Sequence, residues 1–171
     1  MFDIDIISLS IAVILIAAFI LPLYLHISKA KKRETRATKL LEDFAKSQGL
    51  EIQVKDLWRS RYFVGLDRNK AKLLYSDDIA LSSPVLIDLY TISRVKIGEV
   101  SHKVVNQVES RKVIDRLDLI LLDKNGDTAN VLEFYDGNRF SDLNGETILI
   151  KKWETYLEDI TRKILKDQLV L

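Results

Sequence analysis

The chain has 171 residues, with 26 Lys and Arg against 25 Asp and Glu, two His and no Cys, and 47% of its residues are hydrophobic. This length fits one ordinary domain. The net charge of +1 excludes a strongly basic nucleic-acid-binding protein and an acidic disordered tail. The absence of Cys excludes a disulfide scaffold, a thiolate zinc site and a cysteine nucleophile.

The apolar residues are concentrated at the N-terminus, where residues 6–28 contain no Asp, Glu, Lys or Arg. A helix of about 20 such residues spans the roughly 30 Å hydrocarbon core of a bilayer and satisfies its own backbone hydrogen bonds there. The sequence therefore predicts a transmembrane anchor over residues 1–28, with residues 6–28 in the lipid bilayer. A cleaved signal peptide and a buried core helix are the alternatives. A signal is disfavoured because residues 1–5 carry two acids and no base.

A basic cluster follows the apolar segment. It comprises Lys29, Lys31, Lys32, Arg33 and Arg36. Residues 29–39 carry a net charge of +5, whereas residues 1–28 and 40–171 carry −2 each, so the overall neutrality is a cancellation. Because basic residues stay on the cytoplasmic side, the N-terminus is predicted to lie outside and the large C-terminal part in the cytoplasm. The cluster could also bind anionic lipid, or it could only set this topology.

Residues 29–49 are predicted to form this basic juxtamembrane segment and a short amphipathic helix. The apolar stripe of the helix comprises Ala37, Leu40, Leu41, Phe44, Ala45 and Gln48. Gly49 stands where a C-cap glycine is expected. The helix is predicted either to continue from the membrane span or to begin just beyond it. Its stripe could pack on the following domain or pair with a second copy, and its short length favours the first.

After Gly49 the pattern becomes that of β-strands. The predicted strands cover residues 62–66, 71–75, 85–89, 92–100, 114–122 and 128–135. Asn125 and Gly126 lie between the last two strands, and this dipeptide is a strong hairpin signal because both residues accept positive φ. Residues 101–112 are predicted to be either a short strand or a loop.

Only the last part of the chain has a helical period. Trp153 lies in the middle of a wide apolar face between Ile148 and Leu165. Strands and helices do not alternate, which argues against a parallel doubly wound sheet. The predicted fold class is α+β: an N-terminal transmembrane helix, then an antiparallel β-barrel or bent sheet of six or seven strands, capped by a C-terminal α-helix.

The soluble part resembles the bacterial pleckstrin-homology-like (PH-like) domains. The resemblance rests on the hairpin of residues 62–75, the segment 87–92, the Asn125–Gly126 hairpin and the helix with Trp153, and it covers residues 57–165. It implies a PH-like domain over residues 50–171, a bent antiparallel barrel closed by the C-terminal helix, and a location at the inner membrane of a bacterium. One fold serves many functions, so the resemblance implies a binding or scaffolding module without naming its ligand.

No metal site is predicted. Asp123, Asn125 and Asp127 imitate the opening of a calcium loop, but Thr128 stands where that loop needs a glycine and Phe134 where it needs a bidentate Glu. A polar hairpin turn explains these residues instead.

No enzyme and no cofactor are predicted either. His26 and His102 are far apart and cannot form a common zinc motif. The chain contains no Gly-x-Ser-x-Gly, no glycine-rich phosphate loop and no His-Glu-x-x-His sequence. The sequence therefore offers no positioned nucleophile or base.

Basic residues around the first hairpin are the candidate contacts for lipid or a partner. They are Arg59, Arg61, Arg68, Lys70 and Lys72. Arg68 and Lys70 lie in or beside the turn, where they could meet phosphate headgroups of the membrane that anchors the chain. The alternative is a solvated basic edge that prevents aggregation through exposed strands.

The predicted function is a membrane-anchored, non-catalytic cytoplasmic module that binds a protein partner or anionic lipid headgroups, and not nucleic acid. The alternative is a structural subunit of a membrane complex, assembled through the anchor and the juxtamembrane helix.

Overall fold

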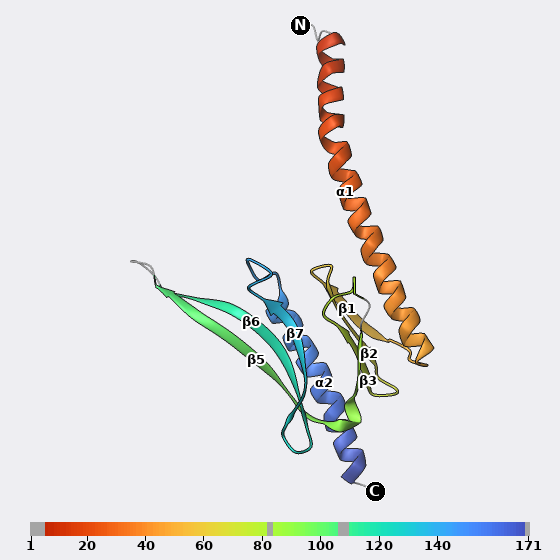
Figure 1. Ribbon diagram of the computed structural model, residues 1–171, viewed down its shortest axis with the longest axis vertical. Helices are drawn as coiled ribbons and strands as arrows, with labels where there is room; N and C mark the ends of the chain where they lie inside the picture. The colour runs from red at the N-terminus through yellow and green to blue at the C-terminus, as the bar shows by residue number, and fades with distance from the viewer. Residues whose placement is uncertain (1–5, 82–83, 106–109, 170–171) are drawn as a thin grey trace.

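The computed structural model describes residues 6–81, 84–105 and 110–169 (Figure 1). Its elements are α1 (Ile6–Ser47), β1 (Val54–Trp58), β2 (Tyr62–Asp67), β3 (Lys72–Ser76), β4 (Val85–Asp88), the 3-10 helix η1 (Leu89–Thr91), β5 (Ile92–Val105), β6 (Ser110–Asp123), β7 (Thr128–Asp136) and α2 (Glu146–Leu169). The fold class is α+β, as predicted.

The predicted membrane span and juxtamembrane helix form one continuous helix, α1, of 42 residues. At 1.5 Å per residue it is about 63 Å long. Among the described residues, α1 is the one helix long and apolar enough to cross a membrane. It ends at Ser47, and Gly49 takes a φ of 69° while its N–H donates to the carbonyl of Lys46 at 2.8 Å. The predicted glycine cap is therefore confirmed.

Strands β1–β4 form an antiparallel sheet, sheet 1, whose central strands β2 and β3 are buried on both faces. Side chains alternate along each strand, so Val64 and Leu66 of β2 join one hydrophobic cluster while Phe63 joins another. The second cluster lies under α1. It comprises Leu41, Ala45, Leu50, Phe63, Leu74 and Ile79. The C-terminal half of α1 thus packs on the outer face of sheet 1, and the packed unit begins before Gln48.

Strands β5–β7 form a second antiparallel sheet, sheet 2. Leu117, Leu119 and Leu121 of β6 are buried and face the main core. The predicted Asn-Gly hairpin is confirmed, because β6 and β7 flank it and Gly126 takes a φ of 88°. The carboxylate of Asp123 accepts the backbone N–H of Asn125 at 2.8 Å and that of Asp127 at 2.9 Å. These bonds explain the polar residues as parts of a turn.

The structure decides between the two predictions for the segment 101–112, and it contains one strand that was not predicted. In the segment 101–112, β5 continues to Val105 and β6 begins at Ser110, so the described residues are strand, and residues 106–109 lie outside the described part. Strand β1 was not predicted, because only Val54, Leu57 and Trp58 are apolar there. It brings the number of described strands to seven.

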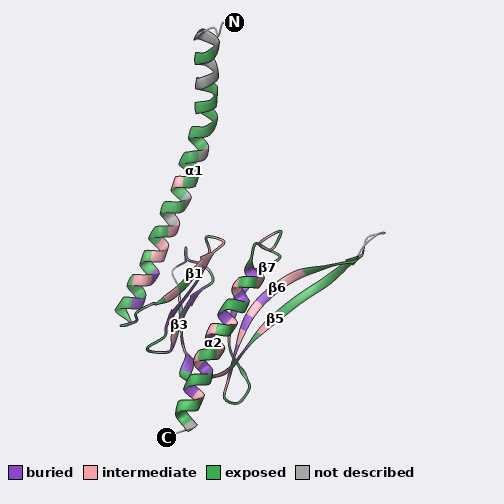
Figure 2. Cartoon of the chain, turned by 180° about the vertical axis from the view of Figure 1, so that it is seen from behind, coloured by how far each residue is buried: buried purple, intermediate pink, exposed green. Residues whose placement is uncertain are grey.

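Helix α2 closes the main core between the two sheets. Trp153 is 0% exposed, and its indole N–H donates to Asp56 of β1 at 2.8 Å. Figure 2 shows buried residues concentrated in the strands and along α2, whereas the described residues in the N-terminal half of α1 are exposed. The predicted burial of the Trp153 face against the strands is confirmed.

The predicted barrel requires a correction, because the described strands form two separate sheets rather than one closed sheet. The chain leaves β4 at Asp88 and turns through η1. The Asp88 carboxylate caps this short helix by accepting the backbone N–H of Tyr90 at 3.0 Å. Leu89 is buried at this bend. The predicted strand 85–89 therefore ends one residue early, and β5 departs in a new direction without pairing with β4 (Figure 1).

Candidate functional site

The domain has two opposite edges that differ in their relation to α1 (Figure 1). The upper edge carries the β1–β2 turn (59–61), the distal ends of β5 and β6, and the β7–α2 loop (137–145). The lower edge carries the β2–β3 turn (68–71) and the β6–β7 turn (124–127). The apolar half of α1 extends beyond the upper edge, so this edge faces any membrane that α1 crosses.

The structure divides the five predicted basic site residues between these edges. Arg59 and Arg61 lie at the upper edge, and Arg68, Lys70 and Lys72 lie at the lower edge. They therefore do not form one basic surface. The split follows from strand geometry, because the two turns of consecutive antiparallel strands lie at opposite ends of a sheet.

The two upper arginines hold loops of the fold together. Arg59 forms an ion pair with the buried carboxylate of Glu146 at the start of α2, and its guanidinium lies 4.8 Å from the centre of the Phe140 ring. The hydrogen bond to Glu146 raises the pKa of Arg59. Arg61 pairs with Asp78 of the β3–β4 loop at 2.7 Å. Both cations are thus neutralised within the domain.

The three lower basic residues also have partners within the chain. Arg68 lies 5.2 Å from the centre of the Tyr156 ring, Lys70 donates to the carbonyl of Gly49, and Lys72 lies 3.6 Å from Asp88. Gly49 follows the last turn of α1, and Ser47 lies about 29 Å along the helix from Ser28. A bilayer around residues 6–28 would be that far away, so this geometry does not support lipid contact by Arg68 and Lys70.

The basic cluster of the juxtamembrane segment lies on α1 between its apolar half and its docked half. Lys29, Lys31, Lys32 and Arg36 are exposed, and the side chain of Arg33 lies outside the described part. These cations would therefore sit at the headgroup level of a membrane that α1 crosses.

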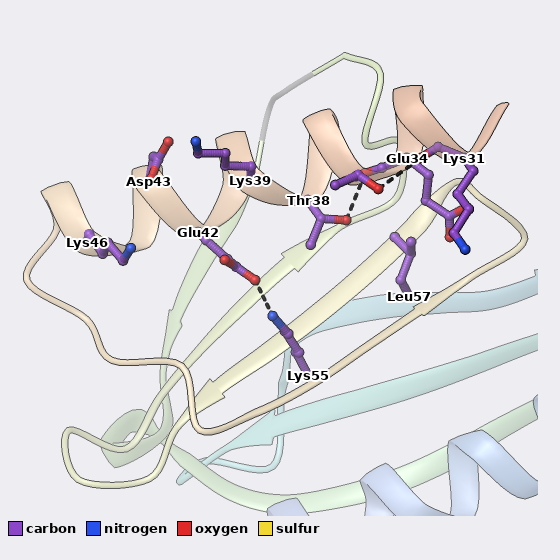
Figure 3. Close-up of a pocket in the computed structure, with 10 residues that line it drawn as sticks. Lys31, Glu34, Thr38, Lys39, Glu42, Asp43, Lys46, Lys55 and Leu57 are labelled. Atoms are coloured by element: carbon purple, nitrogen blue, oxygen red, sulfur yellow. Dashed lines mark hydrogen bonds and ion pairs between the residues drawn. The ribbon is translucent and has the colours of Figure 1, made fainter. Parts of the chain in front are cut away.

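A groove of about 580 Å³, lined mainly by charged residues, runs between α1 and β1 (Figure 3). It is lined by Lys31, Glu34, Thr35, Thr38, Lys39, Glu42, Asp43, Lys46, Lys55 and Leu57. Lys55 of β1 forms an ion pair with Glu42 of α1 across it, and Ser60 donates to Glu34 at 3.5 Å. The groove was not predicted, because its two walls are separate in sequence and neither carries a motif. Lysines and acids alternate along it, so it is a polar seam between helix and sheet.

A second polar cluster joins the two sheets around Glu133 of β7. The hydroxyl of Tyr62 donates to the Glu133 carboxylate at 2.7 Å, Arg139 donates to the same oxygen at 3.1 Å, and the Tyr75 hydroxyl donates to the Glu133 carbonyl at 2.8 Å. Burial raises the pKa of Tyr62, so its hydroxyl remains a donor at neutral pH. Arg116 lies 4.0 Å from the Glu133 carboxylate. This cluster fastens sheet 1 to sheet 2.

Within the described part of the chain, no three His, Asp or Glu side chains gather in a way that could hold a metal ion. Aromatic residues pack against one another in the main core, where the ring of Trp58 stacks on Tyr62 at 5.2 Å and on Phe134 at 4.7 Å. Comparison of the chain with protein-family models, curated proteins and solved structures finds no match.

Proposed function

We propose that the protein is a membrane-anchored, non-catalytic binding or scaffolding module, with its folded domain in the cytoplasm. The observation that carries this proposal is the division of α1 into two halves. Its N-terminal half is apolar, and the side chains described there are exposed, while Leu41 and Ala45 in its C-terminal half are buried on sheet 1. Because one rigid helix makes both contacts, the domain is held at a set distance from the membrane.

The resemblance to bacterial PH-like domains supports the same proposal. Antiparallel strands followed by a C-terminal helix that packs on them are compatible with the family fold, and that fold serves binding rather than one chemistry. The proposed location is the inner membrane of a bacterium. The acidic N-terminus and the basic cluster support an orientation with the N-terminus outside.

The absence of Cys makes the proposed topology easy to test in whole cells. A single cysteine at Asp3 should react with a membrane-impermeant maleimide in intact cells. A single cysteine at Ala129, which is exposed on the domain, should react only after the inner membrane is opened. Labelling of Ala129→Cys in intact cells would contradict the orientation, and release of the protein by a carbonate wash would contradict the anchor.

A second candidate function is a structural subunit that assembles through α1. Leu40 is 53% exposed and Phe44 is 36% exposed, although both belong to the predicted apolar stripe. They lie beside the residues that dock on sheet 1 but remain available to another helix. This observation keeps pairing with a second copy, or with another subunit, as an alternative.

Photo-crosslinking groups distinguish the two functions in the native membrane. A group at Val131 on β7 should capture a partner if the domain is the binding module, whereas groups at Leu40 and Phe44 should capture one if α1 assembles a complex. Both surfaces are exposed, so each group is accessible. Crosslinks confined to Leu40 and Phe44 would overturn the binding-module proposal in favour of the structural subunit.

A further inference from the structure

We propose that the described outer part of the β5–β6 hairpin, the hairpin arm, lies on the anionic surface of the bilayer that α1 crosses. The hairpin arm comprises residues 100–105 and 110–113, the described outer part of β5 and β6 beyond the residues of β6 that pair with β7. This inference depends on the proposed function, because it requires α1 to be a membrane anchor with the domain on the same side as the arm. It assigns a lipid surface to a segment, residues 101–112, that the sequence predicted to be either a short strand or a loop.

The arm is a projection that the rest of the fold does not cover. Strands β5 and β6 have 14 residues each, but β7 pairs with β6 only as far as Arg116, so the arm continues as two strands alone. Its valines are correspondingly exposed: Val100 is 58% exposed, Val104 is 40% and Val113 is 39%. Val104 and Val113 are diagonal neighbours on one face of the ribbon, so together they offer a small apolar surface to a contact outside the domain.

The two faces of the arm combine apolar and basic side chains. Val104 pairs with Arg111 and His102 with Val113 on one face, and Lys103 pairs with Lys112 on the other. Like charges directly opposite each other are destabilising unless an anion lies near them. Lys112 is partly neutralised by Glu99, whereas Lys103 and Arg111 face solvent.

This composition fits an anionic membrane surface. Residues 100–113 contain three bases and one acid, a net charge of +2 in a domain that is otherwise slightly acidic. Each basic residue near an anionic leaflet contributes roughly 1 kcal/mol of attraction. Valine side chains can enter the headgroup region while neighbouring Lys and Arg meet the phosphates.

The position of the arm selects the bilayer rather than a partner in solution. The β1–β2 turn at the upper edge touches α1 at Glu34, through the contact of Ser60 with that residue. Glu34 lies six residues after Ser28, or about 9 Å along the helix. Figure 1 shows the end of the arm at the level of the β1–β2 turn, on the side of the domain toward which the apolar half of α1 extends. The arm therefore reaches the headgroup layer without any change in the fold.

The full-length chain in lipid nanodiscs provides the test, because each position can carry the only cysteine. A polarity-sensitive fluorophore is attached to Val104→Cys, to Leu15→Cys in the apolar half of α1, or to Ala129→Cys at the lower edge. Nanodiscs contain either phosphatidylcholine alone or a mixture with phosphatidylglycerol, and quencher-labelled lipids report contact with the bilayer. We expect quenching at position 104 with the anionic lipid, at position 15 with both lipids, and at position 129 with neither.

Charge removal then tests the electrostatic part. Changing Lys103 and Arg111 to Gln should lower the ratio of lipid-contacting to water-exposed label at position 104 by about fivefold for each charge. The matched control changes Arg94 and Lys96 to Gln, which removes the same amount of charge from the lower part of β5 and should leave the ratio unchanged. Both pairs are exposed, so neither change disturbs the core.

The possible failures are distinguishable. If position 15 is quenched but position 104 remains in water with both lipids, the arm inference is overturned while the anchor stands. If position 15 is not quenched, the proposed function itself fails. Equal quenching at position 104 before and after removal of Lys103 and Arg111 would overturn the role of anionic headgroups. A blue-shifted label at position 104 without lipid quenching would identify a protein contact and overturn the lipid surface.

Discussion

Asp67 shows how one buried carboxylate organises the connection between α1 and the domain. It is 1% exposed, and its two oxygens accept the backbone N–H groups of Glu51 and Lys70, both at 2.9 Å. Burial by itself raises the pKa of Asp67, but these backbone hydrogen bonds outweigh it and the net pKa is lowered. The carboxylate therefore joins the segment after α1 to the β2–β3 turn.

Replacement of Asp67 by Asn should cost about 1–3 kcal/mol of unfolding free energy at pH 7, because the amide offers only one acceptor oxygen for two buried donors. A lowered pKa in the folded state stabilises the fold above the unfolded-state value of about 3.9. That contribution is lost as the pH falls through the lower, folded-state pKa. The difference in unfolding free energy between wild type and variant should therefore become smaller in acid. Denaturant unfolding followed by tryptophan fluorescence at several pH values measures this difference.

Asp159→Asn, at an exposed site on α2, is the control and should change the unfolding free energy little. An equal gap at all pH values would contradict the role of the carboxylate charge.

At the scale of elements, the docking of α1 explains why sheet 1 is apolar on both faces. The run Tyr62-Phe-Val-Gly-Leu66 is continuously apolar, a pattern typical of a strand buried on both sides. Strand β6 instead alternates at Leu117, Leu119 and Leu121, because only one of its faces meets the core. The apolar stripe predicted on α1 does pack on the following domain, but of its residues only Ala37, Leu41 and Ala45 face sheet 1.

Neighbouring leucines on α1 should therefore respond very differently to truncation. Leu41→Ala should cost about 2–5 kcal/mol, since Leu41 is 2% exposed and truncation leaves a cavity against Phe63 and Leu74. Leu40→Ala should change the unfolding free energy by less than about 0.5 kcal/mol, because that side chain is half exposed. Denaturant midpoints of the full-length protein in detergent measure both variants. Equal costs would mean that α1 does not dock as described.

At the scale of the whole molecule, α1 acts as a spacer of defined length. Its charge-free residues end at Ser28, and Glu34, which accepts from Ser60 of the β1–β2 turn, lies six residues later, so the upper edge would lie close to the surface of a membrane that α1 crosses. The near-neutral composition of the whole chain conceals this division, because the charge of +5 on residues 29–39 is nearly cancelled by −2 on residues 1–28 and −2 on residues 40–171. Each part of the chain therefore meets an environment that the average does not describe.

A longer spacer should separate the arm from the bilayer. Insertion of a seven-residue, alanine-rich helical segment after Lys32 should move the domain about 10 Å away from the membrane, because a helix rises 1.5 Å per residue. Lipid quenching of the label at Val104→Cys should then be lost, while the denaturant midpoint stays the same. A flexible Gly-Ser insert of equal length is the control and should restore part of the quenching. Full quenching with the helical insert would contradict a rigid α1.

The sequence by itself determined the local features of this protein. The uncharged stretch of residues 6–28, the glycine after α1, the Asn-Gly hairpin, most of the strands and the helix around Trp153 follow from short-range signals. Hydrophobic period, turn residues and caps act within a few neighbouring positions, and that is why they can be read without a structure. Strand β1 was missed because Lys55 and Asp56 interrupt its apolar pattern. Their partners lie in the two helices: Lys55 pairs with Glu42 of α1, and Asp56 accepts from Lys152 and Trp153 of α2.

Only the tertiary structure decided how these elements face one another. It replaced the expected barrel by two sheets, placed α1 on the outer face of sheet 1, and separated Arg59 from Arg68 although both flank the same strand. It also placed the outer end of β5 at the edge beyond which the apolar half of α1 extends. These outcomes depend on contacts between residues tens of positions apart, and the free energy of such contacts comes from the packing of whole surfaces rather than from any local pattern.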